Sequence, residues 1–432
     1  MALLNTRTSF SGGVFLDEGK SVTQHRPFAD LPTPERLIVP LAQGNELPAE
    51  SCVSPGQDLS AGQPLAVSPE NASPRRSPPV HAPVAATVVD NTFVDTPYRD
   101  RVAAVELRTN AGAIRPQAGV PEGLPAWSAA ELLQRARDGG IALPEVGLPG
   151  GARLDHLIVN GLESEPVQAV RLRTLIEHGQ AVVETSAWLG GILNARRVHL
   201  IVDRARRSLL ARLRAAARGT PVRVVSAPNK YPQSFTPLVV RAVTRREVPC
   251  GGQPEDIGVS TIDVCTLLAL QQAARAGVAR TWIAVTVAGD AVPEPANLRV
   301  PLGTTVGYIA RSVGARPPWS RVVAGNLFAA PALRSPGTVL TTHTSALLFL
   351  RYAPPAVRDP VGCIRCGLCQ SHCPVGIDPR AVLDLVERRR LDEAGQRHPA
   401  ACIDCGLCDY MCPSSLPLMR AVQRSRRHAL GV

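Results

Sequence analysis

Long apolar runs and aromatic residues are scarce in this 432-residue sequence. It has no stretch of about 18 consecutive apolar residues, roughly the length that a membrane-spanning helix needs. Its start, MALLNTRTSFSGG, lacks the apolar centre of a signal peptide. The sequence therefore predicts a protein that is cytosolic or peripheral to a membrane. Aromatic residues make up only 4% of the chain. This argues against a protein that binds nucleic acid by stacking bases on aromatic side chains.

Acidic charge is also in deficit, because the formal net charge is +11 at pH 7. The positive charge is nearly all arginine and is dispersed through stretches such as RARRSLLARLRAAARG, with short runs at residues 388–390 and in RSRRH near the end. Dispersed arginines are typical of solvated helix faces. The alternative is that they dock on an acidic protein or on the anionic surface of the cytoplasmic membrane.

Cysteine is sparse except in two short segments near the carboxyl end. CIRCGLCQSHCP and CIDCGLCDYMCP hold eight of the eleven cysteines, and both follow the C-x2-C-x2-C-x3-C-P pattern of bacterial ferredoxins. In that pattern the fourth cysteine binds the neighbouring cluster. We therefore predict two [4Fe-4S] clusters. One is bound by Cys363, Cys366, Cys369 and Cys412, and the other by Cys402, Cys405, Cys408 and Cys373.

A pair of zinc sites is the alternative use of these cysteines. A zinc ribbon needs two C-x2-C halves and leaves the third and fourth cysteines of each motif without a role. Because neither motif lacks a cysteine, we expect the clusters to carry electrons rather than to catalyse a reaction. We expect the isolated Cys52, Cys250 and Cys265 to be small buried residues.

Short strands and turns are predicted for the amino-terminal third, roughly residues 30–110. The pairing of VSPGQDLSAGQPLA with PVHAPVAATVV looks like the two halves of a barrel-sandwich, lipoyl-type fold. No lysine stands at the hairpin tip between them, so attachment of lipoate or biotin is not supported. SPENASPRRSPP, from Ser68 to Pro79, is typical of a loop.

An α/β region with a parallel, mostly buried sheet is predicted next. A helix begins at Ser128, with Glu131 completing a capping box, and ends at Gly139. LDHLIVNG, VHLIVD and VRVVSAP are predicted strands, and VQAVRLRTLIEHG and RRSLLARLRAAARG are predicted helices. Ligands bind at the carboxyl ends of such strands, which places a site after Val159 and Val225.

The glycine-rich loop CGGQPEDIG is predicted to lead directly into a helix, TIDVCTLLALQQAARAG. A small β-rich unit follows, from TWIAVTVAGDAV to LRVPLGTTVGYIA, before the cysteine motifs. Between the motifs, a helix capped by Asp378 is predicted. The predicted domains are residues 1–120, 121–276, 277–352 and 353–432.

This order of units resembles RnfC, the peripheral subunit of ion-translocating Rnf electron transport complexes. The resemblance covers nearly the whole chain and rests on GGVFLDEGK, PVHAPVAATVV, LIVNGLESEP, NKYPQ, AVTRREVPCGGQPEDIGV, VTVAGDAV and both cysteine motifs. The α/β unit is also similar to the NADH-binding flavoprotein subunit of complex I. The next unit is similar to the β-grasp SLBB module of that subunit. The resemblance implies that FMN accepts hydride from NADH and passes electrons to the clusters.

Seven residues are candidates for binding flavin or nucleotide. Asn160 and Gly161 end a predicted parallel strand, Glu163 and Glu165 could accept hydrogen bonds from ligand hydroxyl or amide groups, and Lys230 could meet a phosphate. Gly251 and Gly252 offer close approach of the backbone to a ligand. The bland alternative for the two glutamates is a turn-stabilising or ion-paired carboxylate.

One departure from the family pattern affects this expectation. Relatives carry a run of glycines ending in Gly-Phe-Pro-Thr, where bare amides face the cofactor phosphate. Here the equivalent is GIALPEVGLPGG, residues 140–151, in which Pro144 has no amide to donate and Glu145 adds negative charge. Whether the chain binds FMN and NADH, and so has NADH dehydrogenase activity of its own, is therefore left open by the sequence.

The leading functional prediction is an iron-sulfur electron-transfer subunit of an Rnf-type complex on the cytoplasmic face of the cell membrane. It would relay electrons between NADH or a ferredoxin and membrane-embedded redox subunits. The alternatives are a scaffold or relay protein with a degenerate flavin fold, and a soluble flavin- and iron-sulfur-dependent reductase. The reductase is disfavoured because in reductases of this architecture the flavin region comes first along the chain, whereas here the barrel-sandwich unit comes first.

Overall fold

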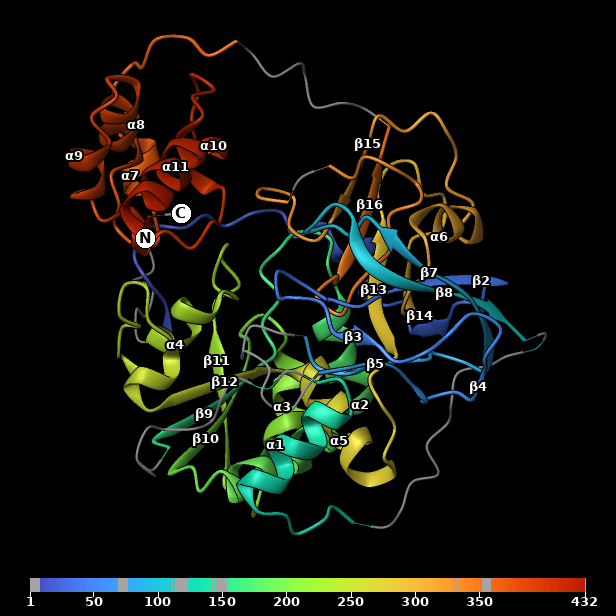
Figure 1. Cartoon of the computed structure of the whole chain (residues 1–432). Helices are drawn as coiled ribbons and strands as arrows, with labels where there is room; N and C mark the ends of the chain where they lie inside the picture. The colour runs from blue at the N-terminus through green and yellow to red at the C-terminus, as the bar shows by residue number, and fades with distance from the viewer. Residues whose placement is uncertain are drawn as a thin grey trace.

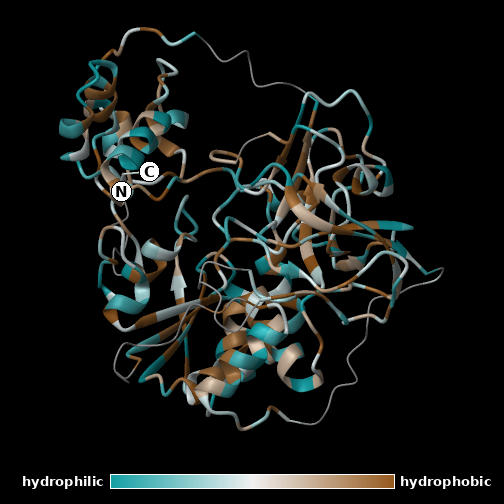
Figure 2. Cartoon of the chain, in the orientation of Figure 1, coloured by the Kyte–Doolittle hydropathy of each residue, from teal (hydrophilic) through white to brown (hydrophobic). Residues whose placement is uncertain are grey.

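The computed structural model describes residues 8–68, 77–110, 112, 123–141, 143, 154–330, 332–351 and 359–431. Figure 1 shows a helical carboxyl-terminal part at the upper left, an α/β part below it and two β units on the right. None of the described helices is long and apolar enough to span a membrane. Apolar residues gather on the strands and on the inward sides of the helices (Figure 2).

The first β unit consists of two small antiparallel sheets. Their strand orders are β2-β8-β7-β4 and β3-β5-β6. The strands are β2 (Arg36–Pro40), β3 (Glu50–Ser51), β4 (Asp58–Leu59), β5 (Pro64–Val67), β6 (Val80–His81), β7 (Ala86–Val94) and β8 (Val102–Thr109). Alternating apolar residues such as Leu37, Val39, Val105 and Leu107 point into a shared core and are fully buried. The predicted all-β unit is confirmed.

The α/β part contains a four-stranded parallel sheet with strand order β11-β10-β9-β12. Its strands are β9 (His156–Asn160), β10 (Arg197–Asp203), β11 (Val222–Ala227) and β12 (Val259–Asp263). Its helices are α1 (Ala129–Asp138), α2 (Val170–Ile192), α3 (Arg207–Ala216), α4 (Thr236–Thr244) and α5 (Val264–Ala276). Leu157 and Val159 face α2 and α5, whereas Ile158 faces α4. Helices therefore cover both faces, which explains the continuous apolar run of β9.

Two of the sequence predictions for this part need correction. The glycine-rich loop does not lead directly into a helix, because VSTID forms strand β12 and α5 begins only at Val264. Helix α2 does not stop near Gly179 but continues to Ile192, with non-helical dihedral angles at His178. Gly179 allows close packing instead, since a Cβ there would lie 2.9 Å from Cδ2 of Leu213. The capping box of Ser128 and Glu131 at α1 is confirmed.

The second β unit is a mixed five-stranded sheet with strand order β1-β14-β13-β16-β15. It comprises β1 (Phe28–Asp30), β13 (Trp282–Ala288), β14 (Ala296–Pro301), β15 (Arg321–Ala324), β16 (Ala346–Leu350) and helix α6 (Val306–Ser312). Strand β13 runs antiparallel to β14 and parallel to β16. Strand β1 pairs in parallel with β14, so this sheet includes a strand from the amino-terminal part of the chain. The two β units share one hydrophobic core.

The carboxyl-terminal part is helical, with α7 (Leu368–Ser371), α8 (Pro379–Glu387), α9 (Leu391–Gly395), α10 (Leu407–Tyr410) and α11 (Leu418–Leu430). Short 3-10 helices occur here at Pro399–Ala401 and elsewhere at Lys20–Val22 and Pro254–Ile257. The carboxylate of Asp378 accepts a hydrogen bond from the amide of Ala381 (3.0 Å), so the predicted cap of α8 is present. Val382 and Leu383 of α8 pack against Leu418 and Val422 of α11.

Candidate functional site

The eight motif cysteines line two separate cavities. Cys363, Cys366, Cys369 and Cys412 line one cavity, which we call the outer site. Cys373, Cys402, Cys405 and Cys408 line the other, which we call the inner site. Each site combines three cysteines of one motif with the fourth of the other, because the short helices α7 and α10 carry the fourth cysteines across. These are the two sets that the ferredoxin pattern predicts, and they support that ligand assignment.

The local geometry of the motif loops fits a thiolate-bound cluster. Gly367 and Gly406 both have φ of 72°, a left-handed conformation that glycine adopts without strain. The amide of Arg365 donates to Sγ of Cys363 and the amide of Asp404 donates to Sγ of Cys402, each at 3.4 Å. Such amides offset negative charge on the sulfurs. Burial raises the pKa of the Cys402 thiol to about 11 and that of Cys405 to about 12, so metal loading at the inner site must displace protons.

Among the described residues, no group of three or more His, Cys, Asp or Glu side chains meets around a single point at ion-binding distance. The four cysteines of a cubane bind four separate irons, so their sulfurs do not need to converge on one point.

The three isolated cysteines differ from expectation. Cys52 and Cys250 are exposed, which corrects the prediction that they are buried, whereas Cys265 is half-buried. Cys52 directly follows strand β3, both of whose residues are exposed, and the inward position falls to Val53. Cys250 lies in an exposed turn before Gly251. Neither belongs to the motif cavities.

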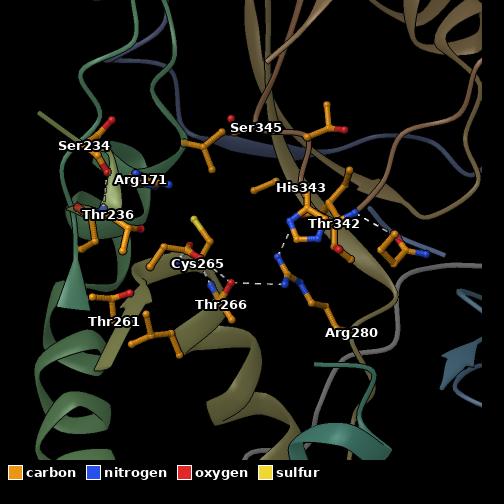
Figure 3. Close-up of a pocket in the computed structure, with 18 of the residues that line it drawn as sticks. Arg171, Ser234, Thr236, Thr261, Cys265, Thr266, Arg280, Thr342, His343 and Ser345 are labelled. Carbon is orange, nitrogen blue, oxygen red and sulfur yellow. Dashed lines mark hydrogen bonds between the residues drawn. The ribbon is translucent and has the colours of Figure 1, made fainter. Parts of the chain in front are cut away.

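A much larger cavity, about 510 Å³, lies between the α/β sheet and the second β unit. Its lining includes the ends of β9 and β12, the first residues of α4 and α5, and residues 342–345 (Figure 3). The volume falls within the range of small-molecule sites, and its place at the carboxyl ends of parallel strands is where such sheets bind ligands.

Half-buried charged side chains distinguish this cavity. Arg171 donates from Nη1 to the Leu162 carbonyl (2.8 Å), and Arg280 donates to the Thr342 carbonyl (3.2 Å) and Oγ1 of Thr266 (3.4 Å). Burial alone would raise the pKa of Asp263, but Arg171 and Arg280 outweigh it and hold that pKa below its usual value. The cavity is therefore lined by two guanidinium groups next to the ionised Asp263, and Glu46 and Glu165 also belong to its lining.

Asp263 also caps helix α5. Its Oδ1 accepts hydrogen bonds from the amides of Cys265 (2.9 Å) and Thr266 (3.1 Å), and its Oδ2 accepts one from Oγ1 of Thr266 (2.6 Å). A helix amino terminus often binds an anionic ligand, but here the protein's own carboxylate occupies that position. Arg171 and Arg280 are the lining groups with the charge to bind an anionic ligand.

Asn160 and Glu165 are the two predicted flavin-site residues that line the cavity. Nδ2 of Asn160 donates to the Ser234 carbonyl (2.9 Å), and its Oδ1 accepts from the Leu162 amide (3.0 Å). Oε2 of Glu165 accepts from Oγ of Ser234 (2.9 Å). Ser234, two residues before α4, therefore bonds both side chains in the lining of the cavity.

Glu163 lies elsewhere, although it is only two residues from Glu165. Its side chain is buried and accepts long hydrogen bonds from the amides of Arg171 (3.3 Å) and Leu172 (3.4 Å) in the first turn of α2. Burial raises its pKa. Lys20 donates to the Glu163 carbonyl. This arrangement corresponds to the bland alternative, a carboxylate that stabilises a turn.

The remaining four candidates do not line the cavity. A Cβ at Gly161 would lie 2.7 Å from Cδ1 of Leu175, so this glycine permits helix-sheet packing. Nζ of Lys230 donates to the Phe10 carbonyl (2.6 Å) and lies 4.1 Å from the centre of that ring. Gly251 is exposed, and Gly252 adjoins the Asp256 carboxylate. The altered glycine stretch lies largely outside the described residues, including Pro144 and Glu145, although Gly140 lines the cavity.

Sequence reasoning missed Arg171, Asp263, Arg280 and His343, which line the cavity. Asp263 had a signal, because it ends strand β12 in register with Asn160 of β9; recognising that strand would have placed the two together. Arg280 and His343 come from outside the α/β sheet. Only the packing of the second β unit against that sheet brings them to the site.

Comparison with protein families divides the chain in the same order. An RnfC barrel sandwich hybrid domain matches residues 8–111, a Nuo51 FMN-binding domain matches 145–272 and a 4Fe-4S dicluster domain matches 355–413. The predicted barrel-sandwich, complex I-type and dicluster parts are thereby confirmed. The predicted cofactor classes, [4Fe-4S] clusters and FMN, are supported by the same matches.

Similar proteins include the C subunit of the proton-translocating ferredoxin:NAD(+) oxidoreductase complex of Clostridium ljungdahlii. It is 27% identical over 90% of this chain and 87% of its own length. The C subunit of the ion-translocating oxidoreductase complex of Serratia proteamaculans is 29% identical over 86% of this chain, which spans only 54% of that protein. Among solved structures, an NAD+-reducing [NiFe]-hydrogenase chain has a TM-score of 0.47 and 15% identity, covering 69% of this chain and 61% of its own.

Proposed function

Because this chain is a relative of the RnfC subunits of ion-translocating oxidoreductase complexes, we propose that it is the iron-sulfur electron-transfer subunit of such a complex. It relays electrons between NADH or a ferredoxin and membrane-embedded redox subunits. The observation that carries this proposal is the pair of cavities that each gather four motif cysteines. Two clusters held in one small domain suit rapid transfer of single electrons.

The eight motif cysteines are proposed as the ligands. Cys363, Cys366, Cys369 and Cys412 would hold one cluster at the outer site, and Cys373, Cys402, Cys405 and Cys408 would hold the other at the inner site. A bound cluster supplies one-electron oxidation and reduction. The protein contributes thiolates, backbone amides directed at the sulfurs and a hydrophobic core beneath both loops.

The large cavity is the proposed site for FMN, with NADH as the substrate. Its volume, its place at the strand ends and its two half-buried arginines support this proposal for an anionic cofactor. Arg171 and Arg280 would neutralise phosphate, and Asn160 and Glu165 in the cavity lining would orient the ligand. A bound flavin would accept hydride and release single electrons. We do not assign Glu163, Gly161, Lys230, Gly251 or Gly252 to ligand contact, since each is away from the cavity lining.

The domain boundaries are proposed at residues 1–120, 121–276, 277–352 and 353–432. We further propose that the third of these is a β-grasp unit of the SLBB type. Support comes from its mixed sheet, in which β13 pairs with antiparallel β14 and parallel β16, with α6 between β14 and β15 along the chain. Strand β1 extends that sheet from outside the proposed boundary.

The proposed location is the cytoplasmic face of the cell membrane, as a peripheral subunit bound to integral redox subunits. The net charge of +11 would favour approach to an anionic membrane surface. The similar proteins are named as subunits of oxidoreductase complexes, which supports an assembly of this kind.

The test is an anaerobic visible spectrum of the purified full chain, with iron and flavin quantified before and after addition of NADH. We expect iron for two clusters, and loss of about half of it in Cys366→Ser. Cys250→Ser is the matched control, because that cysteine is exposed and lies in neither motif. An iron content near zero in the unmodified chain refutes the proposal.

The flavin measurement decides whether this chain takes electrons from NADH itself, as an input module, or receives them from another protein, as a relay. Bound FMN, with bleaching of both flavin and cluster absorbance by NADH, makes this chain the input module. Clusters that dithionite reduces, without flavin and without response to NADH, make it a relay or scaffold that receives electrons from another protein.

A further inference from the structure

The two motif loops have nearly the same sequence pattern but opposite surroundings. Ile364, Arg365, Cys366 and Gly367 of the first motif are all exposed. At the matching positions of the second motif, Ile403 and Asp404 are half-buried, and Cys405 and Gly406 are buried. The first loop therefore presents Cys366 of the outer site to solvent, whereas the matching Cys405 of the inner site is covered by the rest of the protein.

An aromatic cluster covers the inner site. The hydroxyl of Tyr231 donates to the Cys405 carbonyl and accepts from Nδ2 of Asn326 (2.7 Å). The ring of Phe328 lies 4.6 Å from that of Tyr231 and 4.8 Å from that of Tyr410. The carbonyl of Phe328 would be 2.4 Å from a Cβ at Gly406, so only glycine fits this contact.

The amino-terminal segment covers the same site from another side. The amide of Gly13 donates to the His372 carbonyl (2.9 Å), next to the inner-site ligand Cys373. A Cβ at Gly12 would lie 2.7 Å from the Cys373 carbonyl oxygen. The inner site is also adjacent to the large cavity, because Phe235 lines that cavity and its ring lies 5.9 Å from the ring of Tyr231.

The two sites also differ in the charged residues near them. Arg365 occupies the motif position that Asp404 occupies in the second loop. Arg365 and Arg380 both line the outer site, against one carboxylate, Asp378, which caps α8. At the inner site, Asp404 is ion-paired with Arg426 (2.7 Å), and the half-buried Asp409 accepts a hydrogen bond from the amide of Met419 (2.7 Å). Arg380 is itself ion-paired with Asp384 (3.5 Å). The difference between the two loops is therefore the charge at the matched position, which is positive at Arg365 and negative at Asp404.

Reduction adds negative charge to a cluster, so nearby cations and solvent raise its reduction potential, whereas nearby anions and burial lower it. We propose that Arg365 and Asp404, together with the unequal burial of their loops, separate the potentials of the two cluster sites, with the outer site the higher. This inference rests on the proposed function, since it requires that both sites hold clusters. With both sites loaded, one electron leaving the inner cluster would oxidise it and reduce the outer cluster, with no proton or bond exchanged. The protein's own charges thus favour movement from the cavity side toward the exposed loop.

A potentiometric titration of the anaerobic full-length protein, followed by electron paramagnetic resonance, tests this. The unmodified chain should show two midpoints. Arg365→Gln should lower only the higher midpoint, and Asp404→Asn should raise only the lower one, each by a tenfold change in the reduction equilibrium, about 59 mV. Arg424→Gln removes the same charge from an exposed position on α11 that lines neither site and should shift neither midpoint.

A single midpoint in the unmodified chain, or a shift of the lower midpoint by Arg365→Gln, would overturn the inference while leaving the proposed function intact. An absence of iron would instead overturn the proposed function. Arg365 is exposed, so its replacement leaves the fold in place. The titration of Arg365→Gln therefore tests the inference even if Asp404→Asn, which breaks the ion pair with Arg426, loses its cluster.

Discussion

At the scale of single residues, His156 and His199 form an uncommon buried pair in the α/β sheet. Nδ1 of His156 lies 3.0 Å from Nε2 of His199, and the two rings are stacked with centres 5.2 Å apart. One proton between the two facing nitrogens satisfies both, whereas a proton on each would set two N–H donors against one another. Burial, then the neighbouring His156, Arg223 and Arg197, lowers the pKa of His199 to about 4.

This pair predicts acid sensitivity of the fold. In the unfolded chain a histidine titrates near 6.5, so the unfolded state binds protons first as the pH falls. The contribution of His199 is intact above about pH 6.5 and is lost progressively between about 6.5 and 4, on the order of 3 kcal/mol in total. Thermal unfolding of the unmodified chain and of His199→Gln, measured from pH 7.5 to 4.5, should show a smaller decline in the variant. Parallel declines would contradict this role.

At residue scale, some members of the candidate sites could be predicted from the sequence and others could not. The cysteine sets could be derived because their spacing encodes their geometry, and the structure groups them in the same two cavities. Asn160 and Glu165, predicted from their place at and just after a strand end, line the cavity, and their role in ligand binding stays a prediction. Lys230 and Glu163 could not be excluded, since their partners, Phe10 and the first amides of α2, depend on tertiary packing and helix start positions.

At the scale of elements, helix α2 shows how two adjacent glycines can differ in purpose. A Cβ at Gly190 would lie 2.3 Å from Cγ2 of Val198 in β10, whereas a Cβ at Gly191 would meet no atom within 4 Å. Both glycines lie in the last turns of α2. Gly190 therefore serves close helix-sheet packing, and Gly191 only costs backbone entropy.

Alanine substitutions should separate these two roles. Gly191→Ala should stabilise the fold by about 0.5–1 kcal/mol, because alanine has the higher helix propensity. Gly190→Ala should destabilise it by about 1–3 kcal/mol, as overpacking does in well-packed cores. Chemical denaturation of the two variants provides the comparison. Equal effects of the same sign would show that the packing at Val198 does not constrain α2.

Element boundaries were the least predictable part of the fold. Strand β12 was missed because its sequence, VSTID, has few apolar residues and directly precedes the apolar run of α5. Its strand conformation comes from pairing with β9, from Val259 opposite His156 to Asp263 opposite Asn160. Strand β1 was likewise absent from the prediction, because its partner β14 lies far away in the sequence and no local pattern encodes such a pairing.

At the scale of the whole molecule, the amino-terminal segment joins parts that are distant in the sequence. Val14 forms a bridge with Tyr231, and the amide of Gly13 bonds to His372 of the first cysteine motif. The Glu18 carbonyl accepts from the Val167 amide (2.7 Å) in the α/β part. Lys20 is buried against Glu163. The segment thus helps to hold the helical carboxyl-terminal part, which we call the cysteine domain, against the part of the protein that contains the large cavity.

The cysteine domain also contacts the rest of the protein at Gly406. The matching residue of the first motif, Gly367, provides a matched control. Gly367 and Gly406 share φ of 72°, so alanine adds the same backbone strain at both. Only at Gly406 would the new Cβ meet another part of the protein, 2.4 Å from the Phe328 carbonyl, whereas at Gly367 nothing lies within 4 Å. The difference between the two variants therefore measures the docking contact alone.

We expect Gly406→Ala to release the cysteine domain from Tyr231 and Phe328, while Gly367→Ala leaves it docked. Limited proteolysis of the anaerobic full chain should then cleave between the second β unit and the cysteine motifs several-fold faster in Gly406→Ala than in Gly367→Ala. Because undocking exposes the inner site to solvent, the lower of the two cluster midpoints should also rise in Gly406→Ala. Equal cleavage rates would mean that the contact at Gly406 does not hold the domain, and that the amino-terminal segment alone fixes it.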